Sequence, residues 1–205
     1  MNEIDRLTEY FREFPGIGPR QAKRFVYFLL RKDSGYIKGM TDSISNLKKY
    51  IKNCPSCFRF FLEKNFTDPN HSLCSICSDK NRDAELLMVT AKDSDMDVIE
   101  KSHSYNGLYF ILGANIQILE KNPEHKVRLS ELVNKIENSK LKEVIISMSA
   151  NTEGEHTIDI IRGKIAPISL KNGFKITVLG RGLSTGAELE YSDSETIKEA
   201  LKHRG

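Results

Sequence analysis

The chain has 205 residues, of which 39% are hydrophobic, and it carries a formal net charge of +3 at pH 7. This composition indicates a globular chain with a modest core, and the small net charge does not by itself imply a nucleic-acid partner. No run approaches 18 consecutive apolar residues, which excludes a membrane-spanning helix. The N-terminus lacks the apolar segment of a signal peptide, so we expect a cytoplasmic protein.

Two helices are predicted at the start of the chain. Apolar residues at helical spacing give the first helix one buried face, and they are Ile4, Leu7, Phe11 and Phe14. Pro15 ends this helix, and Pro19 suits the first position of the next one, which we expect to run to about Arg31. Its apolar side consists of Ala22, Phe25, Val26, Leu29 and Leu30.

The connection between these helices reads Phe14-Pro-Gly-Ile-Gly-Pro19 and resembles a helix-hairpin-helix, a DNA-binding element without sequence preference. Glycines in the turn would let backbone N–H groups approach a phosphate at the positive end of the second helix. Basic residues, with Tyr27 among them, follow directly along one side of the second helix. The predicted DNA-binding residues are Gly16, Gly18, Arg20, Lys23, Arg24 and Arg31. The alternative is a plain helical hairpin with a solvated basic face.

The four cysteines of the chain form two pairs, Cys54-Pro-Ser-Cys57 and Cys74-Ser-Ile-Cys77, with 16 residues between them. This spacing predicts a structural site in which Cys54, Cys57, Cys74 and Cys77 bind one Zn²⁺ per chain. Metal binding would stabilise a segment that is too short to form its own core. The alternative is two disulfides, which a reducing cytoplasm disfavours, or four unrelated thiols. His71 is a candidate replacement ligand, but four thiolates already complete a tetrahedron.

Strands and helices alternate in the second half of the chain. Buried strands are predicted at residues 86–89, 108–112, 144–148 and 174–179. Helices are predicted at residues 94–101, 129–136, 157–165 and 193–202. This order predicts a parallel sheet with helices on both faces and a binding edge at the carboxyl ends of the strands. Neither a dinucleotide-binding loop around Gly180 nor a P-loop is supported, because the glycine spacing differs and no G-x-x-x-x-G-K-[ST] occurs.

The ordered set of motifs resembles the RecR family of bacterial recombination mediators over nearly the whole chain. Besides the glycine turn and the cysteine pairs, the resemblance rests on Asp79–Asp83 (DKNRD), Asn106–Gly113 (NGLYFILG), Asn151–Glu155 (NTEGE) and Gly180–Tyr191 (GRGLSTGAELEY). The sequence departs from the family pattern after Gly113, where a second glycine and a Pro-Leu-Asp-Gly run are replaced by Ala114–Pro123. The resemblance therefore does not extend to the loop at the end of the second strand.

The resemblance implies a Toprim-type α/β domain and a homo-dimer or homo-tetramer that closes around DNA. It also implies action with RecO, and in some bacteria RecF, to load RecA onto single-stranded DNA. Glu153 and Glu155 are the predicted partner-binding residues. The expected parts are a helix-hairpin-helix region (1–52), a four-cysteine zinc module (53–80), a Toprim-like α/β domain (81–180) and a C-terminal assembly segment (181–205).

Catalytic Toprim domains hold Mg²⁺ with a glutamate after the first strand and a D-x-D after the third. This chain has Thr90 at the first position and Ser149-Ala-Asn151 at the second. Asp93, Asp95 and Asp97 follow the first strand, where we expect them to stabilise the start of a helix that Ser94 caps. We therefore expect a protein without enzymatic activity. Two alternatives remain: a metal-dependent Toprim nuclease or primase-like enzyme, and a protein-binding zinc module without DNA contact.

Overall fold

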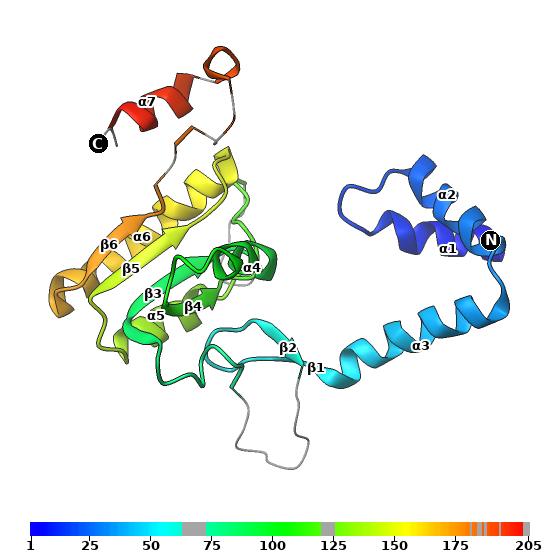
Figure 1. Cartoon of the computed structure of the whole chain (residues 1–205), viewed down its shortest axis with the longest axis horizontal. Coiled ribbons are helices and arrows are strands. Elements are labelled where there is room, and N and C mark those ends of the chain that lie inside the picture. The colour runs from blue at the N-terminus through cyan, green and yellow to red at the C-terminus, as the bar shows by residue number, and fades with distance from the viewer. Residues whose placement is uncertain are drawn as a thin grey trace. The chain divides into compact units, whose positions relative to one another are not determined.

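The computed structural model of the chain describes residues 1–62, 73–119, 126–180, 182–183, 186, 188–192 and 194–202 (Figure 1). The chain forms two compact units, residues 1–52 and 53–205, which we describe separately. The four parts predicted from the sequence, with boundaries after residues 52, 80 and 180, stay a prediction. None of the helices in the described ranges has the length and apolar character needed to span a membrane.

The first unit consists of three helices: α1 (Glu3–Arg12), α2 (Pro19–Leu30) and α3 (Ser34–Tyr50). Side chains cap two of them, because Asn2 accepts a hydrogen bond from the Asp5 N–H (2.9 Å) and Asp33 accepts one from the Tyr36 N–H (2.9 Å). α1 and α2 are the two predicted helices. α3 was not predicted, and it is the main difference between the sequence analysis and the structure of this unit.

α1 and α2 pack through a small apolar core of Phe11, Ala22 and Val26. The Phe11 ring meets the Phe25 ring edge-on, with 5.5 Å between the ring centroids. The expectation that Phe14 lies on the buried side of the first helix was wrong, and Leu30 of the predicted apolar side is exposed as well. Phe14 follows the end of α1 and is 55% exposed, and Leu30 is 62% exposed at the last position of α2.

The second unit is built on a four-stranded parallel sheet with the order β4-β3-β5-β6. Its strands are β3 (Asp83–Thr90), β4 (Gly107–Ile111), β5 (Glu143–Ser147) and β6 (Lys175–Val178). The helices α4 (Asp93–Lys101), α5 (Leu129–Glu137) and α6 (Thr152–Asn172) connect successive strands. The predicted α/β class and its parallel sheet are therefore confirmed.

The two faces of the sheet are covered differently. On one face, Leu87, Val89, Phe110, Val144 and Ile146 form the largest core with apolar residues of α5 and α6. On the other face, Met88, Tyr109 and Ile111 pack against α4 and against the cysteine-containing segment. The prediction of helices on both faces is confirmed, and the cysteine segment shares the second face with α4.

The cysteine segment begins with a two-stranded hairpin of β1 (Ile51–Asn53) and β2 (Phe60–Leu62), which was not predicted. The chain ends with a 3-10 turn, η2 (Leu189–Tyr191), and with α7 (Ser194–Lys202). The predicted start of the last helix, Asp193, and the candidate ligand His71 lie outside the described residues, as do parts of the motif from Gly180 to Tyr191.

Candidate metal centre and nucleic-acid interface

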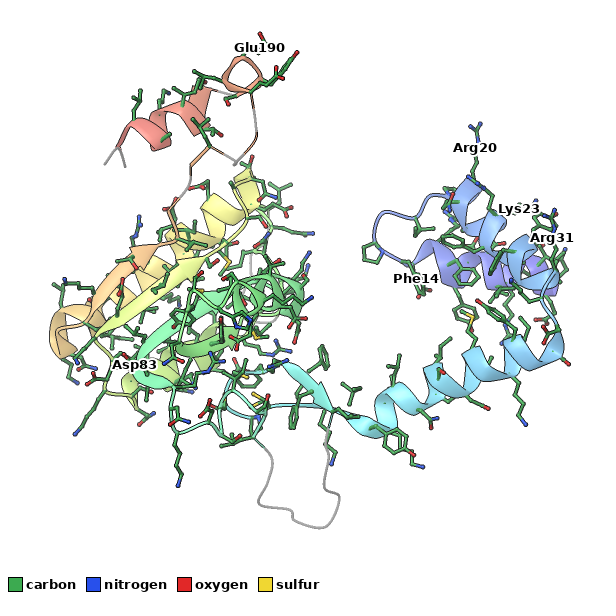
Figure 2. The ribbon with its side chains drawn as sticks, viewed as in Figure 1. Phe14, Arg20, Lys23, Arg31, Asp83 and Glu190 are labelled. Carbon is green, nitrogen blue, oxygen red and sulfur yellow. The ribbon has the colours of Figure 1, made fainter. Side chains whose placement is uncertain are left out.

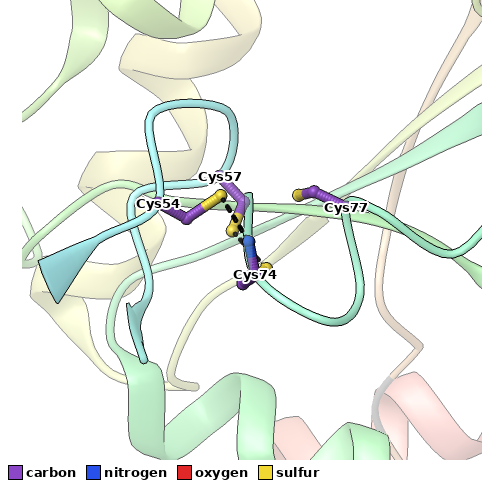
Figure 3. Close-up of side chains that lie close together, drawn as sticks. All are labelled: Cys54, Cys57, Cys74 and Cys77. Carbon is purple, nitrogen blue, oxygen red and sulfur yellow. Dashed lines mark hydrogen bonds between the residues drawn. The ribbon is translucent and has the colours of Figure 1, made fainter. Parts of the chain in front are cut away.

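The four cysteine side chains converge on one point between two turns of the chain (Figure 3). Their sulfur atoms all lie within 4.8 Å of one another, and Sγ of Cys57 is 3.6 Å from Sγ of Cys74. A tetrahedron of thiolates at about 2.3 Å from a zinc ion has sulfur–sulfur distances of about 3.8 Å. A disulfide requires about 2.05 Å, and all four cysteines are free. The arrangement therefore fits a zinc-type site, and the disulfide alternative is not what the structure contains.

The four thiols are buried or partly buried, and they form hydrogen bonds with one another. Cys54, Cys57 and Cys74 are fully buried, and Cys77 is partly buried. Hydrogen bonds, first from Cys57 and then from Cys74 and Cys77, hold the pKa of Cys54 below its ordinary value. The backbone N–H of Cys74 also donates to Sγ of Cys54 (3.5 Å). The same hydrogen bonds raise the pKa of Cys57 and of Cys77, in each case first through Cys54, so negative charge is unevenly distributed among the four thiols.

The first cysteine turn is fixed to the edge of the sheet by contacts from distant parts of the chain. The Ile111 N–H of β4 donates to the Cys57 carbonyl oxygen (2.8 Å). Lys135 of α5 donates through Nζ to the Ser56 carbonyl oxygen (3.0 Å) and to its hydroxyl (2.8 Å). Sequence analysis did not identify Lys135, because no local pattern links it to a turn 79 residues away.

Phe58, next to Cys57, adds a second anchor. It adopts a left-handed backbone conformation with φ of 63°, which is uncommon for a residue with a side chain. Its ring packs edge-on against Phe110 of β4, with 5.3 Å between centroids, and the Arg128 guanidinium lies 5.2 Å from the ring centroid. These contacts explain how the turn keeps this conformation.

The predicted DNA-binding residues lie together at the α1–α2 turn and along α2. Gly16 has φ of +76° and therefore needs to be glycine, whereas Gly18 has φ of −82°, which any residue adopts. Of the two glycines, only Gly16 therefore has a backbone conformation that a side chain would disfavour. Gly18 is the N-cap of α2, no side chain caps the helix there, and no atom within 4 Å would meet a side chain at that position. The start of α2 is thus open to an anion.

Three cations extend from the exposed side of α2, and a fourth, Arg31, follows at its C-cap. Arg20, Lys23, Arg24 and Arg31 are all exposed, and Figure 2 shows Arg20, Lys23 and Arg31 pointing outward from the helix. Within the described part of the chain, no carboxylate lies within ion-pair distance of these four side chains. Arg24 donates a hydrogen bond only to Gln21 (3.3 Å). We call these four residues the basic stripe.

The carboxyl edge of the sheet contains hydroxyl and amide groups where a Toprim enzyme has carboxylates. Thr90 is fully buried, and Asn151 caps α6 by accepting a hydrogen bond from the Gly154 N–H (2.8 Å). Thr157 accepts a hydrogen bond from the Ile116 N–H (2.8 Å), which fixes the loop after β4 against α6. Glu153 and Glu155 are exposed in the first turn of α6.

Each acid after β3 has a structural partner. Asp93 accepts a hydrogen bond from the Phe60 N–H (2.8 Å), Asp95 accepts one from the Lys92 N–H (3.1 Å), and Asp97 lies 4.0 Å from Arg59. The expectation that Ser94 caps this helix was wrong, because α4 begins at Asp93 and Lys92 is its N-cap. Among the described residues, the four cysteines form the only cluster of three or more candidate metal ligands.

Comparison with known proteins agrees with these features. Residues 4–48 match the helix-hairpin-helix model of RecR proteins, and residues 85–180 match a Toprim domain model. The chain is 33% identical to recombination protein RecR of Chloroflexus aggregans over 201 residues, which is 98% of this chain and 92% of the relative. It belongs to the RecR family. RecR proteins of Roseiflexus castenholzii (33% identity, 98% and 92% covered) and Bifidobacterium animalis subsp. lactis (31% identity, 98% and 94% covered) are also similar. The RecR resemblance predicted from the sequence is thereby confirmed.

Proposed function

We propose that this member of the RecR family is a DNA-binding recombination mediator that acts in recombinational DNA repair. The observation that carries this proposal is the basic stripe: four exposed cations along α2 and at its C-cap, without carboxylate partners among the described residues, beside an uncapped helix start. Phosphate groups complement both features. The family relationship, which extends over 98% of the chain, supports the role in recombination.

The proposed DNA contacts are Gly16, Gly18, Arg20, Lys23, Arg24 and Arg31. The open N-terminus of α2 would receive a phosphate, and the basic stripe would follow the backbone of single-stranded or double-stranded DNA. Such contacts carry no sequence information, because phosphates are the same at every step. The mediator therefore binds DNA without sequence preference, as its role at many chromosomal positions requires.

One Zn²⁺ per chain is the proposed occupant of the cysteine cluster. Four buried or partly buried thiols at tetrahedral spacing leave no open coordination position for a substrate, which is typical of structural zinc. The metal would supply folding free energy to a segment without a core of its own.

Cys74→Ser should abolish stoichiometric zinc and destabilise the protein by more than about 4 kcal/mol. Ser75→Ala, in the same turn, is the matched control, and zinc-free, stable wild-type protein would contradict the assignment.

Homo-oligomerisation is the third part of the proposal. A cavity of about 850 Å³ lies open on the first unit, and its lining is mostly apolar. Its lining includes Ile37, Met40 and Ile44, which recur at helical spacing along α3. Met40 is 36% exposed and Ile44 is 54% exposed. A second copy of the chain is the partner we propose for this surface, as a dimer or as half of a tetramer.

RecO, and RecF where it is present, are the proposed partners of Glu153 and Glu155. These carboxylates stand at the carboxyl edge of the sheet, where α/β proteins usually bind their ligands. With these partners the protein would help to load RecA onto single-stranded DNA in the cytoplasm.

We propose no catalytic step, since Thr90 and Asn151 have structural roles at the positions of the metal-binding carboxylates. Nicking of a plasmid in the presence of Mg²⁺ or Mn²⁺ would contradict this.

A salt series of DNA affinity tests the proposed function. Replacing Lys23 and Arg24 with alanine should weaken binding to all sequences alike and reduce the slope of log affinity against log salt by roughly 0.7–0.9 for each phosphate that is no longer bound. The matched control replaces Lys101 and Lys140, two exposed lysines of the second unit, and should leave the slope unchanged. An unchanged slope in the folded Lys23/Arg24 variant would contradict the assignment of the basic stripe.

A further inference from the structure

Tyr27 lies in the middle of the basic stripe. At 100° per residue it falls on the same side of α2 as Arg20, Lys23, Arg24 and Arg31, and it is separated from the nearest three by one helical turn. Its side chain is 46% exposed. A large aromatic ring is thus surrounded by cations and water, on the side of the helix opposite to the α1–α2 core.

Among the described residues, the ring of Tyr27 has no partner that would explain its position. In the described part of the chain it makes no contact with another ring and lies under no cation. Phe28 differs, although it is equally exposed at 49%, because its ring contacts Tyr36 (6.2 Å between centroids) and lies 4.7 Å from Nζ of Lys32. Tyr27 also does not line the apolar cavity that we assign to a second copy of the chain.

We propose that Tyr27 is a stacking platform for an unpaired base of single-stranded DNA, an inference that rests on the proposed DNA contact of the basic stripe. Proteins that bind single strands combine cations along the backbone with aromatic rings on which bases stack, and every base offers a flat face. The four cations would hold the phosphates on either side of the base. A base within a duplex has both faces covered, so the ring would discriminate unpaired from paired DNA without reading sequence.

The test compares Tyr27→Ala, Tyr27→Leu and Tyr27→Phe with the full-length wild-type chain. The probes are a single-stranded oligonucleotide that contains 2-aminopurine, whose fluorescence is quenched by stacking, and a blunt duplex of the same length. Tyr27→Ala and Tyr27→Leu should bind the single strand roughly 5- to 150-fold more weakly. These two variants should quench the 2-aminopurine fluorescence less than the wild type does. Both should bind the duplex with wild-type affinity. Tyr27→Phe keeps the aromatic face and should behave as the wild type in all three measurements.

The salt dependence of DNA affinity and the native mass distinguish base stacking from other roles of Tyr27. Because the cations remain, the slope for each variant should equal that of the wild type. Equal losses on single strand and duplex, unchanged single-strand affinity in Tyr27→Ala, or a changed native mass would each overturn the stacking assignment. A changed mass would place Tyr27 in a protein interface instead. If the wild-type chain binds neither form of DNA, the proposed function itself fails, which is distinguishable from failure of the Tyr27 assignment alone.

Discussion

Gly154 shows how a single residue shapes the carboxyl edge of the sheet. It lies in the first turn of α6, where a Cβ atom would overlap the carbonyl oxygen of Ser149 and also approach Oδ1 of Asn151 (3.2 Å). Both groups define how the chain leaves β5 and enters α6. The Asn-Thr-Glu-Gly-Glu motif therefore combines a cap, Asn151, with a glycine that permits close approach of the backbone.

Alanine at two positions of α6 should have opposite effects. Gly154→Ala should lower the free energy of unfolding by about 1–3 kcal/mol or more, because the backbone of Ser149 has to move. Gly163→Ala, in the same helix with no atom within 4 Å of the new methyl group, should raise it by roughly 0.5–1 kcal/mol. Urea denaturation of both variants measures the two changes in unfolding free energy. Equal effects of the same sign would show that the close approach of the Ser149 backbone to Gly154 is unimportant.

Arg82 is a second residue with a role that periodicity could not indicate. It follows the second cysteine turn, and its guanidinium binds the carboxylate of Glu100 in α4 and the carbonyl oxygen of Gly107 in β4 (3.3 Å). The hydrogen bond from Arg82 holds the pKa of Glu100 below its ordinary value. Arg82 thereby ties the end of the cysteine segment to two elements of the α/β unit.

This pair predicts a specific dependence of stability on pH. A carboxyl group whose pKa is depressed by folding is protonated more readily in the unfolded chain, so its contribution is complete above the ordinary glutamate pKa of about 4.3 and is lost as the pH falls below it. Glu100→Gln should reduce the free energy of unfolding at pH 7 by roughly 1–3 kcal/mol. Below about pH 4 the wild type and the variant should converge. If the difference in unfolding free energy between the wild type and the variant stayed constant down to about pH 2, this role of the pair would be contradicted.

At the scale of elements, the spacing of the cysteines predicted the metal centre, but not the surface to which it is attached. The structure places the first cysteine turn on β4 and α5 through Ile111 and Lys135. Lys135→Met should therefore accelerate the loss of zinc to a chelator several-fold and reduce stability by about 1–3 kcal/mol, since it removes two charged hydrogen bonds. Lys140→Met serves as the control, because that exposed lysine is not in contact with the turn. Identical release rates for both variants would contradict a supporting role of Lys135.

The regular elements were predicted where local pattern and tertiary packing agree. β3, β4 and β5 differ from the predicted strands by a few residues at their ends, because buried apolar runs mark them clearly. α6 is much longer than the predicted helix at residues 157–165. Pro167 suggests an end, yet the helix continues to Asn172, since Ile158, Ile161, Ile165 and Ile168 pack together against the sheet.

α3 was missed for a different reason. Gly35 and Gly39 lower its helix propensity, and none of its residues is buried within the chain. Its apolar residues, among them Met40 and Ile44, occur at helical spacing but face the open cavity of the first unit. Within the chain none of these residues is fully buried, although residues of α1 and α2 line the same cavity. This is consistent with the proposed assembly.

In the proposed assembly, several weak DNA contacts act together. One basic stripe offers about four phosphate contacts and should bind weakly at physiological salt. Several copies in one assembly raise the effective concentration and can increase affinity by roughly 10²–10⁴. Ending the chain at Ser192, which removes α7, should reduce the number of copies in the native assembly and weaken DNA binding, although the basic stripe stays intact. A truncated chain with an unchanged number of copies per assembly and unchanged affinity would show that α7 is not needed for assembly.

The native mass of the wild-type chain, measured with and without single-stranded DNA, tests whether the protein binds DNA as an assembly. We predict a dimer or tetramer that binds DNA as an assembly, with an apparent affinity that rises with protein concentration more steeply than simple one-to-one binding allows. A folded monomer that binds DNA one-to-one with full affinity would contradict a mediator that encloses DNA.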